Sequence, residues 1–510
     1  MFRLLGLLGG LSLVTDVGTG APLEESLKRC VVAARLAKAV GCPPAQTSEL
    51  LYTSLLQHLG CTAYAHEGAD VWGDDIAVVR LAFLTNFADR TDVWRTWVPG
   101  LADATGTSRA RVVATALTAG RKGEVAGPAA TCEVARDASR WLGLPESVQD
   151  DLFHALTMWN GKGHPAVAGD DIPLATRLMH VAATAALFTL HAGQAEAVAQ
   201  VRRRSGTYLD PGLAEVFVDR ADELVGDLAE LDGYEEALAS EPHPVVLVDE
   251  DRVEAVARTF GSLADLKSPW LQGHSAGVAE LAAAAAAGLG LADQVRTVRV
   301  AGHLHDVGRV GVSSRIWDKP GPLSATERDQ ARLHPYYSER ILARTPALAD
   351  VARLVGQHHE RCDGSGYHRG LAAGQLTMPS RVLAAADNYR ALVEDRPHRP
   401  AIPATAAAGR LRAEARSGRL DADAVAAVLQ ASGLRTGARR TRPADLTERQ
   451  VEVLRMVAAG LSNQQIARRL VISRRTAEHH VQDIYLKIGA STRAGAALFA
   501  MQHGLLDEPG

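Results

Sequence analysis

Several features that would place this 510-residue chain in a special class are scarce or missing. Its five cysteines are scattered and include no C-x-x-C pair, which argues against a disulfide framework and favours a reducing cytoplasm. No apolar run reaches the roughly 18 residues of a membrane-spanning helix, so we expect no membrane partner. Aromatic residues make up only 5% of the chain, and alanine is very frequent. This composition favours helices.

The two ends of the sequence differ in character. The opening MFRLLGLLGGLSLV has one arginine before an apolar run, but no small-residue cleavage site follows it cleanly. We interpret it as the first helix of the fold, with secretion as the lesser alternative. The net charge is −4, yet residues 435–510 carry 12 Lys and Arg against 7 Asp and Glu. A basic tail on an acidic body indicates a nucleic-acid-binding module at the C-terminus.

The tail has the pattern of short helices joined by a tight turn. Thr447 with Gln450 and Ser462 with Gln465 form capping boxes, and Ser473 can cap the next helix, RRTAEHHVQDIYLKIG. Apolar residues recur at helical spacing on one side of these segments, while the other side of the last one is basic and polar. The pattern predicts a helix-turn-helix, the alternative being a small helical cap with a solvated charged face.

The stretch LSNQQIARRLVISRRTAEHHVQDIYLKIGASTR resembles the DNA-binding domain of LuxR/GerE-type regulators. Ala477 stands where that family more often has valine. The resemblance implies that 473–487 is the recognition helix, and that the protein binds double-stranded promoter DNA as a homodimer through its last helix, 491–503. It also implies phosphate contacts from Arg475, Thr476 and Lys487, and base contacts from Glu478, His479 and Gln482.

Histidines and aspartates suited to metal binding follow one another through residues 260–434. A single histidine at a helix end can simply favour the negative end of the helix dipole. A series of seven histidines and aspartates is harder to explain by helix dipoles alone. Imidazoles mixed with carboxylates suit Fe, Mn or Zn, and a carboxylate can bridge two ions. The seven are His274, the pair His305 and Asp306, His334, the pair His358 and His359, and Asp387.

This series and the turn DGSGY at 363–367 resemble the HD-GYP branch of the HD-domain phosphohydrolases. The resemblance implies two divalent ions, Fe or Mn, that activate water for attack on a phosphate ester such as a cyclic dinucleotide. One ion would take His274, His305, Asp306 and Asp387, and the other would take Asp306, His334, His358 and His359. Asp306 and Arg309 would serve in catalysis, and the substrate would be bound by Arg309, Asp363, Gly366 and Tyr367.

Three positions depart from the pattern of that family. Arg309 replaces the lysine after the HD pair, which keeps the positive charge but changes the geometry of phosphate binding. His368 ends the motif as GYH instead of GYP, which weakens an assignment to cyclic di-GMP. Trp270 stands one helical turn before His274, where some members have a glutamate ligand. We therefore expect two metal ions rather than three.

The first half of the sequence resembles a copy of the middle that has lost its ligands. Ser26 to Gln57 spans 31 residues, as does His274 to His305. The first copy also carries about 45 extra residues, around EGADVWGDDIAVVRLAFLTNFADRTDVW. We interpret this half as a structural partner of the active copy, and a sensory domain for a small molecule is the alternative. In this alignment the ligand positions hold Ser26, Gln57, His58, Thr131, Ala155 and Leu156.

The sequence therefore predicts an all-α cytoplasmic protein of tandem HD-domain bundles followed by a LuxR-type helix-turn-helix. The expected parts are a degenerate copy (1–231), a linker (232–259), a metal-dependent copy (260–434), a basic linker (435–444) and a DNA-binding domain (445–510). The leading function is a transcriptional regulator that carries a phosphohydrolase or phosphodiesterase. One alternative is a regulator whose HD domain only senses a nucleotide or metal. Another is a phosphohydrolase whose tail only sets its location.

Overall fold

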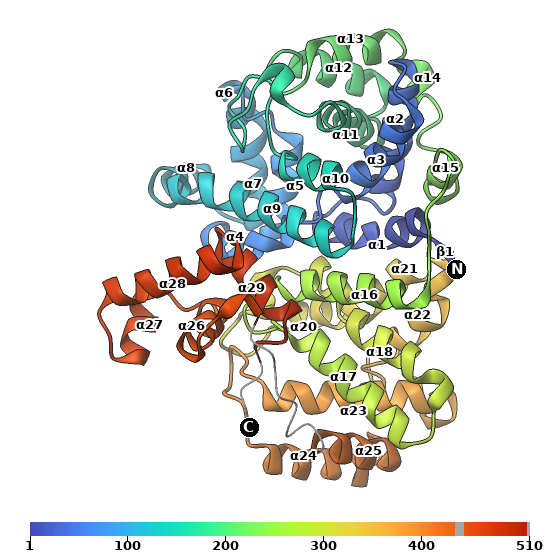
Figure 1. Ribbon diagram of the computed structural model, residues 1–510, viewed down its shortest axis with the longest axis vertical. Coiled ribbons are helices and arrows are strands. Elements are labelled where there is room, and N and C mark those ends of the chain that lie inside the picture. Colours follow the sequence, from blue (N-terminus) through green and yellow to red (C-terminus); the bar gives the residue numbers. More distant parts are fainter. Residues whose placement is uncertain (434–442, 507–510) are drawn as a thin grey trace. The chain divides into compact units, whose positions relative to one another are not determined.

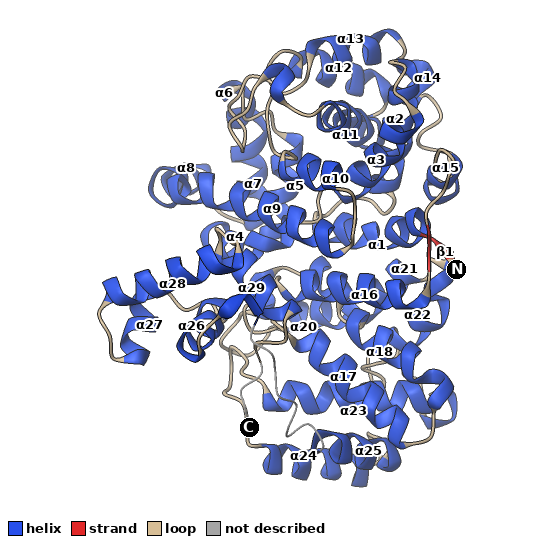
Figure 2. Cartoon of the chain, in the orientation of Figure 1, coloured by secondary structure: helices blue, strands red, loops and turns tan. Residues whose placement is uncertain are grey.

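The computed structural model describes residues 1–433 and 443–506, with only the backbone considered for 119–125 (Figure 1). The chain divides into two compact units, Met1–Glu250 and Asp251–Gly510. Across the described residues the regular structure is helical except for one sheet of two short strands (Figure 2), which confirms the all-α expectation. None of the helices in these ranges combines the length and the apolar character that crossing a membrane requires.

The first unit is a helical bundle arranged around α11. The sequence of this helix is largely apolar, and it packs against α2, α3 and α12. The apolar opening of the chain forms α1, which is buried along most of its length and is therefore a helix of this fold. The elements of the unit are β1 (Phe2–Arg3), α1 (Leu4–Gly18), α2 (Glu25–Ala39), α3 (Pro44–Leu56), α4 (Ala65–Trp72), α5 (Asp75–Leu84), α6 (Arg90–Asp92), α7 (Val98–Thr105), α8 (Arg109–Thr115), α9 (Arg121–Trp141), α10 (Glu146–Phe153), α11 (Leu174–Ala192), α12 (Gln194–Arg204), α13 (Pro211–Asp219), α14 (Ala221–Val225), α15 (Gly233–Ala239) and β2 (Leu247–Val248).

Residues 232–259, expected to be a linker, instead contain regular structure. Tyr234 of α15 is buried and donates a hydrogen bond of 3.2 Å to the carbonyl oxygen of Gly6. β2 pairs antiparallel with β1, which ties the end of the first unit to its beginning. The remainder of the segment begins α16 (Glu250–Asp265). The proline-containing stretch that suggested a linker is thus only the short connection after α15.

The second unit has α17 at its centre, packed against α18, α23 and α25. Its alanine-rich sequence allows close helix packing, since a Cβ atom added to Gly302 of α18 would lie 2.4 Å from the Cα atom of Ala279. The helices before the tail are α16, α17 (His274–Gly288), α18 (Val295–Leu304), the 3-10 helix η6 (Val307–Gly311), α19 (Ser314–Trp317), α20 (Ala325–Arg332), α21 (His334–Leu342), α22 (Ala349–Val355), α23 (Met378–Val393), α24 (Ala404–Arg416) and α25 (Ala422–Gly433).

The tail forms α26 (Glu448–Ala458), α27 (Asn463–Leu470), α28 (Arg474–Ile488) and α29 (Arg493–Gln502) around a small apolar core. The capping boxes predicted at Thr447 and Ser462 are both present, and the Ser473 side chain caps α28. The tight turn before α28 contains Val471 in a left-handed conformation, with φ of 55°. Most of the predicted basic linker, 435–442, lies outside the described residues.

The two copies repeat one backbone pattern, and this corrects the alignment by one residue at its start. Glu25 begins α2 and His274 begins α17, each after a residue in the left-handed region. The next residues, Ser26 and Ser275, each donate through backbone and hydroxyl to an aspartate ten residues earlier. Glu25, and not Ser26, therefore stands at the position of His274.

A second correspondence agrees with the predicted alignment. An added Cβ atom on Gly60 would lie 2.0 Å from the carbonyl oxygen of Thr131, and one on Gly308 would lie 2.2 Å from that of His334. Both glycines allow the same close approach of two segments. Thr131 therefore stands at the position of His334.

Candidate metal centre

The seven predicted ligands come together in the second unit from the ends of its helices. His274 and His334 are the first residues of α17 and α21, while His305 and Asp306 link α18 to η6. The paired histidines follow α22, and Asp387 lies within α23. Six of the seven are buried, and the side chain of His359 is 14% exposed.

Asp306 lies at the middle of this cluster and presents its two oxygens to different histidines. Oδ2 lies 3.0 Å from Nε2 of His305 and 3.6 Å from Nε2 of His274. Oδ1 lies 3.2 Å from Nε2 of His334 and 3.6 Å from Nε2 of His358. A carboxylate in this arrangement has the geometry of a bridging ligand.

Asp387 extends the cluster to its remaining members. Its Oδ1 lies 3.2 Å from Nε2 of His274, and its Oδ2 lies 3.6 Å from Nδ1 of His359. Two groups of mutually close donor atoms result, one made of His274, His305 and Asp306, and the other of His334, His358 and His359. These groups differ from the two sets expected from the sequence only in the aspartates, because Asp387 is absent from the first group and Asp306 from the second.

The hydrogen bonds of Nδ1 in three of the histidines determine which ring nitrogen carries the hydrogen. Nδ1 of His305, His334 and His358 lies 2.6–2.8 Å from a backbone carbonyl oxygen three residues earlier. A carbonyl oxygen only accepts, so Nδ1 carries the hydrogen and Nε2 keeps a lone pair. Nε2 of each of these three histidines therefore presents a lone pair to the centre.

The centre consequently collects more lone pairs than hydrogen-bond donors. Nε2 of His334 lies 3.2 Å from Nε2 of His358, and both are close to Oδ1 of Asp306. Neither oxygen of Asp306 accepts a well-aligned hydrogen bond, nor does Nε2 of His305. Buried polar atoms without partners are costly, and a cation would satisfy all of them at once. The donor set fits a divalent metal that accepts imidazole and carboxylate.

The protonation states of Asp306 and His334 suit metal binding as well. Burial works to raise the pKa of Asp306, but Arg309 and His305 outweigh it and hold the pKa well below its usual range. Burial lowers the pKa of His334 to about 4, although the nearby carboxylate of Asp306 works to raise it. An ionised carboxylate and a neutral imidazole are the forms that bind metals.

Arg309, expected to act on phosphate, lies at the edge of the cluster. Its Nη2 is 2.8 Å from Oδ2 of Asp306, and its guanidinium lies over the Trp317 ring, 5.1 Å from the centroid. The indole nitrogen of Trp317 also donates to the carbonyl oxygen of Arg309 at 3.2 Å. The arginine is thus held beside the proposed metal position. No motif in the sequence predicted this contact between Arg309 and Trp317.

The turn after the paired histidines has a divided role. The Tyr367 ring lies 4.5 Å from the His359 ring, beside the centre. Gly366 packs against the backbone of Glu360, where a Cβ atom would lie only 2.5 Å from Cα. Asp363 is exposed and accepts hydrogen bonds from Ser365, so its carboxylate closes the turn. Of the predicted substrate residues in this turn, Tyr367 adjoins the centre and Asp363 does not face it.

His368 and Trp270 also differ from their expected settings. His368 is exposed, and its ring lies 5.9 Å from that of Tyr336. Trp270 lies in a turn, because α17 begins only at His274. The spacing of four residues between them is therefore not one turn of a helix.

Glu394, Arg390 and Arg396 adjoin the centre but were missed in the sequence. Oε2 of Glu394 lies 2.7 Å from Nδ1 of His274, and both arginines contact the same carboxylate. Burial works to lower the pKa of His274, but Glu394 and Asp387 outweigh it and raise the pKa to about 9. The acidic and basic residues of VEDRPHRP, which follow Asp387 closely, were the available signal.

In the first copy, residues of the insertion occupy the place of the centre. Nη1 of Arg80 lies 3.0 and 3.1 Å from the two oxygens of buried Glu25. The Phe83 ring stacks on the His58 ring at 4.2 Å. Arg80 and Phe83 both belong to α5, within the predicted insertion. Buried Arg29 adds a second guanidinium, with Nη1 3.4 Å from His58 Nδ1. These contacts favour a structural role for this copy.

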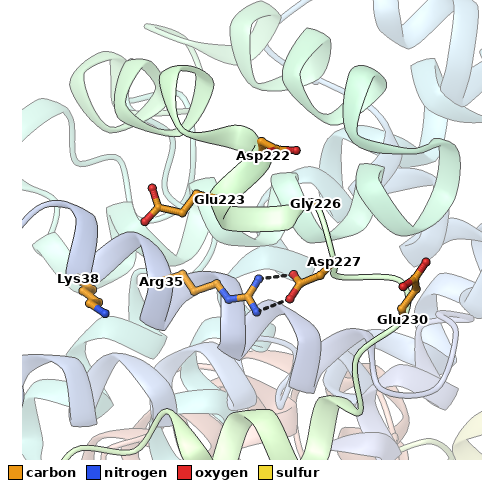
Figure 3. Close-up of a pocket in the computed structure, with 7 residues that line it drawn as sticks. All are labelled: Arg35, Lys38, Asp222, Glu223, Gly226, Asp227 and Glu230. Atoms are coloured by element: carbon orange, nitrogen blue, oxygen red, sulfur yellow. Dashed lines mark hydrogen bonds and ion pairs between the residues drawn. The ribbon is translucent and has the colours of Figure 1, made fainter.

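A surface pocket of the first unit carries no sign of function (Figure 3). Arg35 holds Asp227 there with both terminal nitrogens, at 2.5 and 3.0 Å, in an exposed ion pair. None of the predicted site residues lines it. Its lining consists of Arg35, Lys38, Asp222, Glu223, Gly226, Asp227 and Glu230.

In the tail, α28 presents most of the predicted DNA contacts to solvent. Arg475, Thr476, His479 and Gln482 are exposed. Glu478 is partly buried and pairs with Arg474 at 2.8 Å. Lys487 donates to the carbonyl oxygen of Asp445 at 3.0 Å and to Oε1 of Gln450 at 2.9 Å. Lys487 thus has contacts inside the domain that the sequence did not suggest. The exposed residues form a polar surface along one helix.

Comparison with known families divides the chain in the same way. Residues 258–424 match the family described as "HD domain", and residues 444–500 match "Bacterial regulatory proteins, luxR family". The first match contains all seven predicted ligands. The second contains α26, α27, α28 and most of α29.

Two curated relatives and one solved structure resemble the chain. The 3'3'-cGAMP-specific phosphodiesterase 3 of Vibrio cholerae is 28% identical over 408 residues, which cover 79% of this chain and 89% of the relative. A cyclic di-GMP phosphodiesterase of Thermotoga maritima is 32% identical over 157 residues, 30% of this chain and 43% of the relative. The crystal structure of a cyclic GMP-AMP specific phosphodiesterase of V. cholerae (V-cGAP3) aligns at 25% identity with a TM-score of 0.58, covering 85% of this chain and 98% of that chain. The chain therefore contains an HD domain over residues 258–424 and a C-terminal domain of the luxR family over residues 444–500.

Proposed function

We propose that this protein is a DNA-binding regulator whose second HD copy hydrolyses a cyclic dinucleotide. The observation that carries the proposal is the setting of Asp306, whose two oxygens face separate pairs of histidines. The relatives support it, since their names describe phosphodiesterases for 3'3'-cGAMP and cyclic di-GMP. The V. cholerae relative is similar over most of both helical copies.

The seven residues would hold two divalent ions with Asp306 shared between them. Such ions, when bound, lower the pKa of water and stabilise the charge that develops on a phosphate. Iron and manganese accept this mixture of imidazole and carboxylate ligands. One set is His274, His305, Asp306 and Asp387, and the other is Asp306, His334, His358 and His359.

Three further side chains suit a phosphate ester with an aromatic base. The Arg309 guanidinium is held by Trp317 beside Asp306, where it can bind a phosphate through two nitrogens. The Tyr367 ring lies beside His359 and offers a face to a base. Arg332 lies over that ring, 4.9 Å from its centroid, and adds positive charge. These residues would orient the substrate against the centre.

The C-terminal domain would bring the activity to promoter DNA. In this proposal α28 enters the major groove, with Arg475 and Thr476 at phosphates and His479 and Gln482 at base edges. Two chains would bind as a homodimer through α29. The protein would work in the cytoplasm, where both DNA and a nucleotide ligand are present.

Hydrolysis assays on the full-length protein test the enzymatic part. Anaerobically purified protein with Mn²⁺ or Fe²⁺ would be given 3'3'-cGAMP and cyclic di-GMP, and linear products would be separated by chromatography. We expect turnover of at least one of them, loss of turnover in Asp306→Ala, and wild-type turnover in Asp329→Ala, an exposed aspartate of α20. Metal-loaded wild-type protein that hydrolyses neither nucleotide would contradict the proposal.

A second candidate function is a sensor that binds a nucleotide without hydrolysing it. The contact of Arg309 with Asp306 favours this alternative, because an arginine held by the central carboxylate has less freedom to follow a reacting phosphate. Equilibrium binding of the same nucleotides separates the two functions. Tight binding without product formation would support the sensor, while product formation excludes it.

A further inference from the structure

Glu394 is a partly buried acid next to the centre but outside the seven predicted ligands. It follows α23 directly, and its side chain is 18% exposed. Oε2 lies 2.7 Å from Nδ1 of His274, on the side of the ring that faces away from Asp306. The nitrogen that faces inward, Nε2, lies 3.2 Å from Oδ1 of Asp387. The imidazole of His274 therefore connects Glu394 to the centre.

His274 differs from three of the other histidines in the partner of its Nδ1 atom. His305, His334 and His358 each place Nδ1 on a carbonyl oxygen three residues earlier. The equivalent carbonyl for His274, that of Leu271, already accepts the backbone N–H of His274 at 2.9 Å. The Nδ1–H group of His274 is instead directed to the Glu394 carboxylate.

Two arginines hold Glu394 in place. Nε of Arg390 donates to Oε1 at 2.9 Å, and Nη2 of Arg396 donates to Oε2 at 3.0 Å. Nη2 of Arg396 also lies 3.3 Å from Nδ1 of His274, but the 2.7 Å contact of Nδ1 with Oε2 of Glu394 places a hydrogen on Nδ1, because a carboxylate oxygen only accepts. Arg396 reaches further to the carbonyl oxygen of Trp270 at 3.0 Å, in the turn before α17. The carboxylate is thus fixed from two sides.

We propose that Glu394 is a positioning residue for the metal centre. It accepts the hydrogen of Nδ1, which leaves the lone pair on Nε2 and directs it at Asp306 and Asp387. A carboxylate behind a metal-binding histidine also makes the imidazole a stronger ligand. Arg390 and Arg396 act through Glu394 by holding it. This inference rests on the metal site of the proposed function, but it does not depend on turnover.

Metal titration of the full-length protein tests this role. Metal-free protein would be titrated with Mn²⁺ in a calorimeter for the wild type, Glu394→Ala and Glu394→Gln. We expect Glu394→Ala to weaken the affinity by about 10–100-fold, as loss of such partners usually does. Glu394→Gln keeps an oxygen that accepts from Nδ1–H and should lose less. Glu280→Gln is the matched control, since Glu280 is on the same helix as His274 and 51% exposed, and it should bind as the wild type does.

A spectroscopic measurement separates positioning from general damage to the fold. The visible absorption of the Co²⁺-loaded protein reports ligand geometry, and we expect it to change in both Glu394 variants while circular dichroism stays that of the wild type. Wild-type affinity and spectrum in both variants would overturn the role of Glu394 alone. If Glu394→Ala does not fold, wild-type behaviour in Glu394→Gln overturns it equally. A wild-type protein that binds no metal would overturn the site itself, and binding without hydrolysis would overturn only the enzymatic proposal.

Discussion

Arg80 holds both carboxylate oxygens of Glu25, at 3.0 and 3.1 Å, where the second copy has His274. Glu25 is 4% exposed, and Arg80 places a positive charge beside it. Where the second copy has a predicted metal ligand, the first copy therefore has an acid that pairs with an arginine of its own insertion. This exchange explains how one fold can keep a polar centre in one copy and a candidate metal site in the other.

Removing Arg80 should destabilise the first unit. Arg80→Ala leaves a buried carboxylate unpaired, which typically costs about 3–5 kcal/mol. Urea unfolding followed by circular dichroism measures the loss. Arg111→Ala, at an exposed position of α8, is the control and should change stability little. Equal stability of the two variants would mean that the ion pair does not support the first copy.

The stability of the first unit should depend on the protonation of Asp151. Burial raises the pKa of Asp151 to about 7, even though Thr53 and Thr176 donate to it. In the unfolded chain the pKa is about 3.9, so the folded state keeps a proton that the unfolded state releases. The contribution of Asp151 is therefore greatest in acid and is lost as the pH rises from about 4 to about 7.

Asp151→Asn should remove this dependence. Between pH 5 and pH 7 the stability of the wild type should fall relative to Asp151→Asn by roughly 2–3 kcal/mol. Asp150→Asn, at the exposed neighbouring position, should follow the wild type. Urea midpoints at several pH values make the comparison. A constant difference between wild type and Asp151→Asn would contradict the burial of a protonated aspartic acid.

Gly308 should be essential for bringing His334 to Asp306. Its backbone N–H donates to Oγ of Ser338 at 2.8 Å, and an added Cβ atom would lie 2.2 Å from the carbonyl oxygen of His334. Gly308→Ala must move backbone, which typically costs about 1–3 kcal/mol, and should reduce the bound metal. Gly288→Ala has open space around it and should be neutral or stabilise α17. Metal content and thermal unfolding of both variants check this, and wild-type metal binding in Gly308→Ala would contradict it.

Two basic residues of α28 should behave differently on DNA. Arg475 is exposed, so Arg475→Ala should weaken binding to a mixed-sequence duplex and reduce the salt dependence by about one ion. Lys487 donates to two acceptors inside the domain, so Lys487→Ala should also lower the stability of the tail by about 1 kcal/mol. Fluorescence anisotropy at several salt concentrations and thermal unfolding separate the effects. Identical DNA affinity of Arg475→Ala and wild type would contradict the proposed orientation of α28.

The parts that the sequence predicted well depend on short-range patterns. Thr447 and Gln450 form their capping box because both partners lie within one helical turn. The family of each domain was recognisable because pairs such as His305 and Asp306 stand at fixed positions within conspicuous motifs. The seven predicted ligands lie together in the structure, and their role as ligands stays a prediction.

The parts that the sequence did not predict depend on contacts between distant segments. Glu394 reaches His274 across 120 residues, and no local pattern marks it. Arg80 and Phe83 of the insertion fill the centre of the first copy, and nothing in the sequence of the insertion indicated this. The predicted alignment placed Ser26 at the position of His274 because both copies showed a spacing of 31 residues. In the structure Glu25 has that position, so the first copy has one more residue between the start of α2 and the close approach at Gly60.

The metal content of the anaerobically purified full-length protein tests the central claim most directly. Our account places one dinuclear centre in the second copy and none in the first. Elemental analysis should find about two Fe or Mn ions per chain in the wild type, and Asp306→Ala should lose most of them. A wild-type chain without bound metal, or one that keeps about two ions after Asp306→Ala, would contradict the account.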